Sequence, residues 1–395
     1  MIYLDHAATT PMHPDAIAAM AEQLARVGNA NSLHASGRAA RRVVEESREA
    51  LAAAVGARPS HIVFTSGGTE ADNLAVKGLY WSRRAEDARR TRVLAAKIEH
   101  HAVLDPLIWL EEHEGATIEW LPVDRAGRVL PEVLDEALRA DPDSAALVTV
   151  MWANNEVGTI QPIQDLVAVA HAYDVPIHSD AVQAVGHLPV DFAASGLDAM
   201  TITGHKIGGP IGVGALLLDR KATPTPLLHG GGQERDVRSG TLDAPAIAGF
   251  AAAATAVTQD RDEESVRLAV LRDALIDGVL KAVPDAMLSG DSNNDRDHDL
   301  RHRLPSIAHF CFPGCEGDSL LLLLDARGIE VSTGSACSAG IAQPSHVLLA
   351  MGADPDLARG SLRFSLGRTS TPEDVEALVS ALPSVVERAR SAGLS

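Results

Sequence analysis

The chain has 395 residues, of which 34 are basic and 53 acidic, giving a formal net charge of −19. This balance argues against nucleic-acid binding through a broad basic face, because neutralising phosphates needs clustered lysine and arginine. The three cysteines are too few for a disulfide framework and suit a reducing compartment. The N-terminal residues MIYLDHAATTP do not resemble a signal peptide, and the longest weakly polar stretch, residues 245–257, is too short to span a bilayer. We therefore expect a cytoplasmic protein without membrane or direct nucleic-acid contacts.

Short apolar runs alternate with helical patterns through the first two-thirds of the chain. Strands are predicted at residues 61–65, 92–97, 145–151, 175–179, 200–203 and 214–218. A turn at residues 66–69 separates the first strand from a helical pattern that begins at Glu70, and another helical pattern covers residues 164–173. Strands that alternate with helices predict a mostly parallel sheet covered by helices on both faces.

The pattern changes near residue 260. A charged segment at residues 259–264 opens a long helical pattern, and residues 289–301 are polar enough to predict a surface loop. The stretches 306–312 and 360–366 predict strands of a second, smaller sheet. The chain is therefore expected to be an α/β protein with a large domain followed by a smaller one.

Two ionisable residues follow predicted strands of the large domain. Lys206 comes just after one strand, at the sheet edge where ligands bind in parallel-sheet proteins, and lysine can form a Schiff base with an aldehyde cofactor. Asp180 follows another strand and could keep a pyridinium nitrogen protonated. Taken singly, a solvated lysine and a helix-capping aspartate remain alternatives.

The sequence SGGT at residues 66–69 lies between a strand and a helix. Its glycines would let the backbone approach a phosphate, and the helix that follows would offer free N–H groups. The GxxxxGK[ST] pattern of a Walker loop is absent, and an ordinary glycine turn remains an equal alternative.

The three cysteines have different surroundings. Cys337 lies among small residues in STGSACSAG (332–340), which predicts an accessible thiol on a loop. Cys311 lies in an apolar run and is predicted to be in the core, whereas Cys315 follows a Pro-Gly turn. The C-x-x-x-C spacing of the latter two is a poor metal signature.

Together these motifs resemble the cysteine desulfurases of the NifS/IscS type, in the class V aminotransferase family of fold-type I pyridoxal-phosphate enzymes. The resemblance runs over nearly the whole chain, through YLDHAATTP (3–11), FTSGGTEADN (64–73), IEHHAV (98–103), NNEVGTIQPI (154–163), HSDAVQAVG (178–186), TGHKIGGPIGVGAL (203–216), GGGQERDVRSGT (230–241), GSACSAG (334–340) and LRFSLGR (362–368). It implies a large cofactor-binding domain at 15–260, a small domain at 261–395 carrying the cysteine loop, and an arm at 1–14 that joins the small domain.

The resemblance also implies pyridoxal 5′-phosphate as the cofactor and assigns residues to it. Lys206 would carry it as a Schiff base, and Asp180 would pair with its ring nitrogen. The resemblance assigns His100 to stack on the ring and move protons. Only one of His100 and His101 could do so, because adjacent side chains on a helix diverge. Gln183 would hydrogen-bond the ring hydroxyl, and the phosphate would be bound by Gly68, Thr69, Thr203 and His205. Thr241 would bind the phosphate of a neighbouring subunit. Arg363 and Asn155 would bind the substrate carboxylate, and Asn155 would also border the cofactor. The active unit implied is a homodimer.

The reaction implied is the conversion of L-cysteine to L-alanine, with the sulfur transferred to Cys337 as a persulfide. Lys206 would act as general base and acid, and the loop at residues 332–340 would swing to deliver the sulfur. The sulfur acceptor would be a protein, either an iron–sulfur scaffold or a tRNA-thiolation enzyme, and Cys337 could also serve as an iron–sulfur ligand.

Three other functions remain open on the sequence alone. Transamination on the same cofactor would make Cys337 incidental, and selenocysteine lysis could use the same site. A non-catalytic sulfur-relay protein would need Cys337 but no cofactor. The combination of Lys206, Asp180 and Gln183 with the SGGT turn argues against a relay protein.

Overall fold

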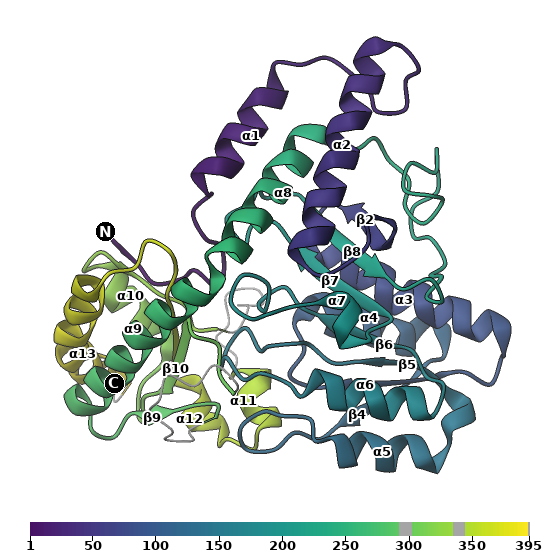
Figure 1. The fold of residues 1–395 in the computed structure, drawn as a ribbon. Coiled ribbons are helices and arrows are strands. Elements are labelled where there is room, and N and C mark those ends of the chain that lie inside the picture. Colours follow the sequence, from purple (N-terminus) through teal and green to yellow (C-terminus); the bar gives the residue numbers. More distant parts are fainter. Residues whose placement is uncertain (292–301, 335–343, 394–395) are drawn as a thin grey trace.

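The computed structural model describes residues 1–291, 302–334 and 344–393. Within these ranges a large body surrounds a seven-stranded sheet, and a smaller body contains a three-stranded sheet. A long helical run connects the two bodies (Figure 1). The predicted α/β architecture, with a mostly parallel sheet covered by helices, is confirmed.

The large sheet has one antiparallel strand. In spatial order its strands are β2 (Ile62–Thr65), β8 (Gly214–Leu218), β7 (Ala199–Thr203), β6 (Ile177–Asp180), β5 (Ala145–Thr149), β3 (Arg92–Ala96) and β4 (Thr117–Leu121). β8 runs antiparallel to both of its neighbours, and the other pairings are parallel. The carboxyl ends of β5, β6 and β7 therefore lie along one edge of the sheet.

Helices cover both faces of this sheet, which explains its nearly continuous apolar strands. One face packs against α3 (Gly68–Glu86) and α4 (His101–Glu114). The other face packs against α2 (Ala35–Ala54), α5 (Pro131–Ala140), α6 (Ile163–Ala172) and α8 (Ala244–Gln259). Alternate strand residues point to opposite faces, so that Val63 contacts the first layer whereas Ile62 and Phe64 contact the second.

Several shorter or peripheral elements complete the large body. They are α1 (Pro14–Leu24), α7 (Phe192–Ser195) and two 3-10 turns at Pro59–His61 and Pro142–Ser144. α1 packs on α8, and in Figure 1 α1, α2 and α8 stand out together beyond the sheet at the top of the molecule.

The smaller body has a phenylalanine-rich core formed by Phe310, Phe312 and Phe364. Its sheet has the order β12 (Ser361–Ser365), β10 (Ile307–Cys311) and β9 (Met287–Leu288), all antiparallel. Its helices are α9 (Arg261–Ala282), α10 (Gly317–Asp325), α11 (His346–Ala350), α12 (Pro355–Arg359) and α13 (Pro372–Gly393).

The N-terminal segment packs with the smaller body. β1 (Ile2–Tyr3) pairs in parallel with β11 (Ile329–Glu330), and Leu4 is buried in the same core as Phe310. This packing is what an arm joining the small domain requires. The exact domain boundaries expected at residues 14 and 260 stay a prediction.

Several predicted elements shift by one or two residues. His61 closes a 3-10 turn, so β2 begins at Ile62. α3 begins at Gly68 rather than Glu70, because the Glu70 carboxylate accepts the Ser66 N–H at 2.7 Å and closes the first helical turn. Of the predicted surface loop at 289–301, residues 292–301 lie outside the described residues.

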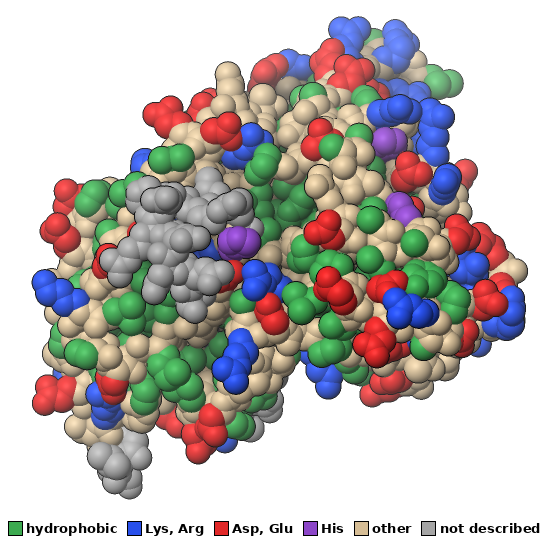
Figure 2. Space-filling model, turned by 60° about the horizontal axis from the view of Figure 1, so that its bottom comes forward, with side chains coloured by type: hydrophobic (Ala, Val, Ile, Leu, Met, Phe, Trp, Pro, Cys, Tyr) green, Lys and Arg blue, Asp and Glu red, His purple; other side chains and the backbone are tan. Residues whose placement is uncertain are grey.

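No helix within the described ranges is long and apolar enough to cross a membrane. Figure 2 shows acidic and basic side chains mixed over the visible face of the molecule. The cytoplasmic location stays a prediction.

A buried ion pair fixes the segment that follows β8 onto the large body. Arg48 of α2 donates to both carboxylate oxygens of Glu234, at 2.8 and 2.7 Å, and Glu234 also accepts the Phe64 N–H at 2.9 Å. The two charged side chains are only 4% and 1% exposed. Removing one partner of such a pair destabilises a protein strongly, because the remaining charge stays buried without its partner.

Arg48→Ala is therefore expected to lower the free energy of unfolding by about 3–5 kcal/mol. Urea unfolding followed by circular dichroism measures the loss. The matched control is Arg89→Ala, which removes a solvent-exposed pair with Asp87 and should leave stability nearly unchanged, because water screens such pairs. Equal losses for the two variants would contradict the prediction.

Candidate functional site

A cavity of about 420 Å³ lies at the carboxyl edge of the large sheet, where the N-terminal arm and the smaller body meet it. Most of the predicted site residues line this cavity: Gly68, Thr69, His100, Asn155, Asp180, Gln183, Thr203, His205, Lys206 and Arg363. Thr241 is exposed and does not line it. Cys337 lies outside the described residues, although Gly334, three residues before it, is part of the cavity wall.

Asp180 is the last residue of β6, and its carboxyl group is buried at the cavity wall. One oxygen accepts the Val182 N–H at 2.9 Å, so the side chain caps a turn rather than an α-helix. Burial raises the pKa of Asp180 to about 6. A cation close to the carboxylate would favour its ionised form, which makes Asp180 a suitable partner for a protonated ring nitrogen.

Two further buried carboxyl groups lie near Asp180. Asp72 and Glu99 are almost completely buried, and burial raises the pKa of each well above its ordinary value. The Asp180 charge adds to both upward shifts. Burial thus disfavours the charged form of all three carboxyl groups.

Lys206 follows β7 and reaches the N-terminal arm. Its Nζ donates to the backbone carbonyls of Ala7 at 2.5 Å and Ala8 at 2.8 Å, and Gln183 Nε2 donates to the Ala7 carbonyl at 2.9 Å. Burial, followed by the nearby Arg363 charge, lowers the pKa of Lys206 to about 8. The amine is therefore available as a nucleophile near neutral pH.

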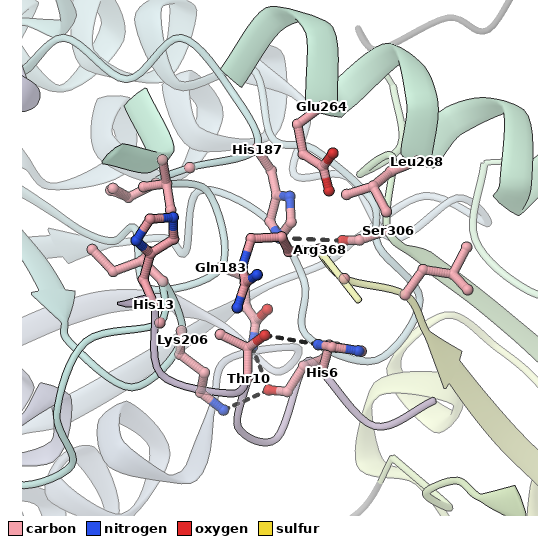
Figure 3. A pocket seen from close by; sticks show the side chains of 18 of the residues that line it. His6, Thr10, His13, Gln183, His187, Lys206, Glu264, Leu268, Ser306 and Arg368 are labelled. Atoms are coloured by element: carbon pink, nitrogen blue, oxygen red, sulfur yellow. Dashed lines mark hydrogen bonds between the residues drawn. The ribbon is translucent and has the colours of Figure 1, made fainter. Parts of the chain in front are cut away.

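The arm also separates this cavity from a second one of about 140 Å³. Lys206, Gln183 and Ala7 line both cavities. Figure 3 shows Lys206 and Gln183 reaching the arm, where His6 Nδ1 and Thr10 Oγ1 lie 2.7 Å apart. Residues of the arm thus form a partition behind the reactive amine.

The first turn of α3 forms another part of the main cavity wall. Gly68 and Thr69 are the first two residues of this helix, so its free N–H groups are available there to an anion. A Cβ at Gly68 would lie 3.3 Å from Val182, and Gly67 has a φ of 151° that favours glycine. Thr203 adds a hydroxyl group to the same lining. These donors suit a phosphate.

His205, next to Lys206 in the sequence, also contacts the arm. Its Nδ1 lies 2.9 Å from Thr9 Oγ1. Burial and then the Lys206 charge lower the pKa of His205 to about 4, so the ring is neutral at physiological pH.

His100 caps α4 rather than lying within it. Its Nδ1 accepts the Ala102 N–H at 3.1 Å, which places the proton of the neutral ring on Nε2. Although His100 is exposed at one side, desolvation by the surrounding protein, followed by the Lys206 charge, lowers its pKa to about 4. His101 is exposed and contacts Asp105 at 3.0 Å. His100 is the N-cap and only His101 is helical, so the premise that both side chains project from the helix was wrong, and both residues line the cavity.

Arg363 lies on β12 with its side chain almost fully buried. Nη1 donates to the Asn155 carbonyl at 2.8 Å, and Nη2 donates to Asp5 Oδ1 at 2.7 Å. Its Nε is buried and has no hydrogen-bond partner among the described residues. A buried donor without a partner is costly, so this guanidinium suits a small carboxylate in the cavity.

The sequence analysis missed several residues of the cavity wall. They include Ala7, Ala8, Asp72, Met151, Glu156, Ser332 and His346. Asp5 and Glu156 lie inside motifs quoted above, so their residue types were visible. Their partners were not, because those contacts join segments far apart in the sequence.

Within the parts of the chain that the structure describes, no group of three or more histidine, cysteine, aspartate or glutamate residues is arranged to hold a metal ion. Cys311 and Cys315 are free and buried, and a core position was expected for Cys311 alone. A metal-ligand role for Cys337 stays a prediction, since the residue lies outside the described ranges.

Comparison with known proteins places the chain among well-defined relatives. Residues 2–378 match the model of the class-V aminotransferase family. The chain is 58% identical to an IscS-like cysteine desulfurase of Mycobacterium tuberculosis, covering 100% of this chain and 98% of the relative. It is 44% identical to a cysteine desulfurase IscS of Dictyoglomus turgidum, over 99% and 95% of the two chains. The solved structure of a NifS-like protein superposes with a TM-score of 0.87 at 33% identity, covering 98% of both chains.

The Lys206 amine is expected to become reactive with a midpoint near pH 8 in the cofactor-free protein, because burial and the Arg363 charge disfavour the ammonium form. Brief acetylation between about pH 6 and 10, quantified per residue by mass spectrometry, measures this midpoint, with the ordinary lysine value of 10.5 as reference. Arg363→Leu should move the midpoint upward, because it removes a neighbouring positive charge. A wild-type midpoint above 10 would contradict the prediction.

Proposed function

The chain belongs to the class-V aminotransferase family and, within it, to the cysteine desulfurases, and on this premise we propose how its residues do the work. The proposal is that Lys206 binds pyridoxal 5′-phosphate and that the sulfur of L-cysteine passes to Cys337 as a persulfide, leaving L-alanine. The observation that supports it most is the joining of Lys206, Asp180 and Arg363 in one buried cavity.

The cavity residues fit pyridoxal 5′-phosphate at each of its functional groups. Lys206 offers an amine with a lowered pKa for the aldehyde, and Asp180 offers a buried carboxyl for the ring nitrogen. The other contacts would be His100 over the ring, Gln183 and Asn155 at its edge, and Gly68, Thr69, Thr203 and His205 around the phosphate. When bound, the cofactor supplies an electron-withdrawing ring that stabilises negative charge at the substrate Cα.

Arg363 and Asn155 would orient the substrate. The guanidinium is already fixed by the Asn155 carbonyl and by Asp5, so its three remaining N–H donors do not have to be ordered on binding. A planar, permanently charged fork matches a carboxylate better than an ammonium does. The substrate Cα would thereby be directed toward Lys206.

Lys206 would move the proton of the substrate Cα. With a pKa of about 8, Nζ can accept this proton near neutral pH and return a proton later. The carbonyls of Ala7 and Ala8 accept hydrogen bonds from the ammonium form and hold it in place. The neutral His100 ring, with its proton on Nε2, is a second carrier beside the same cavity.

The sulfur step balances without an outside oxidant. The Cys337 thiolate attacks the sulfur of L-cysteine and an S–S bond forms. The carbon–sulfur bond breaks, and its electron pair stays with the substrate carbon. One L-cysteine and one thiol thus give one L-alanine and one persulfide. Transamination would require a keto acid and would leave Cys337 unchanged, so the two reactions differ in both products and residue requirements.

We also propose that the active unit is a homodimer in which Thr241 reaches the cofactor phosphate of the partner. Supporting this, Thr241 is exposed, does not line its own cavity, and ends the motif whose Glu234 is fixed by Arg48. The persulfide would pass to a protein acceptor, an iron–sulfur scaffold or a tRNA-thiolation enzyme. An iron–sulfur ligand role for Cys337 belongs to the same proposal.

The central test follows alanine and sulfide together, using pyridoxal-phosphate-loaded protein, L-cysteine and a thiol reductant. Wild type should yield both products in equal amounts, and Cys337→Ala should lose more than about 100-fold of the rate, because no thiol remains to take the sulfur. Cys315→Ala, which removes a buried thiol from the smaller body, is the matched control and should stay active. Full alanine and sulfide production by Cys337→Ala would refute the sulfur-transfer role.

A second prediction concerns substrate binding. Arg363→Lys keeps a positive charge but loses the planar fork, so the KM for L-cysteine should rise about 10- to 100-fold, in keeping with a loss of about 1.5–3 kcal/mol for a charged hydrogen bond. Steady-state kinetics measure it. Arg390→Lys, a change far from the cavity at a partly exposed ion pair with Asp285, should leave KM unchanged. An unaltered KM in Arg363→Lys would remove Arg363 from the substrate site.

A further inference from the structure

Ser365 is a fully buried serine at the end of β12 that the reaction described above does not use. It follows Arg363 by two residues, and Phe364, which lies between them, packs in the core of the smaller body. Because side chains alternate along a strand, Arg363 and Ser365 project from the same face of β12, opposite to that core. Both side chains reach the N-terminal arm from this face.

Ser365 holds the arm close to the Lys206 amine. Its hydroxyl accepts the Ala7 N–H at 2.9 Å and donates to the Leu4 carbonyl at 3.3 Å. Its backbone pairs with the arm as well, since its N–H donates to the Leu4 carbonyl at 2.8 Å and its carbonyl accepts the His6 N–H at 3.4 Å. This one residue therefore makes both backbone and side-chain hydrogen bonds to the arm.

The arm presents two backbone carbonyls to the amine directly after this contact. Lys206 Nζ donates to the Ala7 carbonyl at 2.5 Å and to the Ala8 carbonyl at 2.8 Å. Gln183 Nε2 donates to the same Ala7 carbonyl at 2.9 Å. The N–H that Ser365 holds and a carbonyl that Lys206 contacts thus belong to a single residue, Ala7. A shift of the N–H would move the carbonyl with it.

Arg363 reaches the same arm from its own position on β12. Its Nη2 donates to Asp5 Oδ1 at 2.7 Å, and its Nη1 donates to the Asn155 carbonyl at 2.8 Å. The strand and the arm run side by side here, because a parallel bridge pairs Asp5 with Ser365. One short strand therefore carries both the guanidinium proposed for the substrate carboxylate and the hydroxyl that fixes the arm at Ala7.

We propose that Ser365 is a positioning residue that holds the arm carbonyls, and through them the Lys206 amine, at a fixed place relative to the substrate carboxylate. The inference rests on the proposed function, since it assigns Ser365 to proton transfer at the substrate Cα. Loss of the hydroxyl should slow this proton transfer. Binding of the amino acid should change little, because Arg363 keeps its own contacts with Asp5 and Asn155.

The first measurement uses pyridoxal-phosphate-loaded protein and L-alanine in deuterated water. In the proposed reaction Lys206 returns a proton to Cα, so the reverse step should exchange the Cα hydrogen of L-alanine for deuterium. Nuclear magnetic resonance follows this exchange, which does not require Cys337. Ser365→Ala should exchange about tenfold more slowly than wild type, the scale of a small misplacement of reacting groups. L-alanine binding, followed by the cofactor absorbance, should stay within about twofold of wild type.

The second measurement uses the cofactor-free protein and the acetylation midpoint of Lys206. Hydrogen bonds to the ammonium form favour that form, so loosening the arm carbonyls should lower the pKa of Lys206. The midpoint should therefore fall by about 0.5–1 pH unit in Ser365→Ala. The charged groups that act on this amine are Arg363, Asp180 and Asp5, and the variant retains all of them. A shift would thus come from the arm.

Two further variants keep the test decisive. Tyr3→Phe removes the hydroxyl that donates to the Thr9 carbonyl at 2.6 Å, directly after Ala8, and should change both measurements in the same direction as Ser365→Ala. Ser361→Ala removes another buried hydroxyl of β12, one that makes none of these arm contacts, and should match wild type. Thermal unfolding of each variant confirms that folded proteins are being compared.

The possible results are distinct. Wild-type protein that exchanges no deuterium into L-alanine would overturn the proposed proton transfer by Lys206 and the inference with it. Wild-type exchange that Ser365→Ala and Tyr3→Phe both match in rate would overturn the inference alone, as would an unchanged Lys206 midpoint in Ser365→Ala. Equal losses of L-alanine binding and of exchange would also overturn it, because that is the signature of general damage to the cavity.

Discussion

The buried guanidinium of Arg363 holds three separate parts of the chain together. It donates to Asp5 on the N-terminal arm and to the Asn155 carbonyl of the large body, while its backbone pairs with Ser332 of the smaller body. A cation this deeply buried is tolerated only when it is well paired. The arm, the sheet edge and β12 must therefore meet in one arrangement, and the main cavity is the space they enclose.

Around that cavity, burial shifts the pKa of several groups. Burial lowers the pKa of Lys206 to about 8 and raises the pKa of Asp180 to about 6. The two pKa values therefore differ by only about two units. His100 and His205 stay neutral for the same reason. A cavity that contains an amine with a lowered pKa and a carboxyl group with a raised pKa is suited to proton transfer at a carbon next to an amine.

The large sheet and its edge could be predicted because they depend on local patterns. Buried parallel strands are short apolar runs, and the residues at their carboxyl ends must lie along one edge of the sheet. This was enough to predict that Asp180 and Lys206 lie at the same edge. The SGGT turn was also visible, although the helix that follows it begins earlier than expected, at Gly68. That shift has a local cause, the hydrogen bond between Glu70 and Ser66, which periodicity does not reveal.

The rest of the site depends on contacts across the whole sequence, and no window of residues contains them. Asp5 meets Arg363 and Glu156 meets Ser345 only after both bodies have folded. Backbone carbonyls such as those of Ala7 and Ala8 carry no sequence signal, since every residue has one. The individual roles of the cavity residues, the Thr241 contact and the domain boundaries stay predictions.

The long separation between the arm and β12 also has a consequence for synthesis. Asp5 is synthesised 358 residues before Arg363, so their ion pair can form only after Arg363 has been made. At a translation rate of about 5–20 residues per second, this corresponds to a wait of about 20–70 seconds. The large sheet can form during that time, but the Lys206 amine has an enclosed site only when the chain is nearly finished. The cavity around Lys206 is thus incomplete until almost all of the chain has been made.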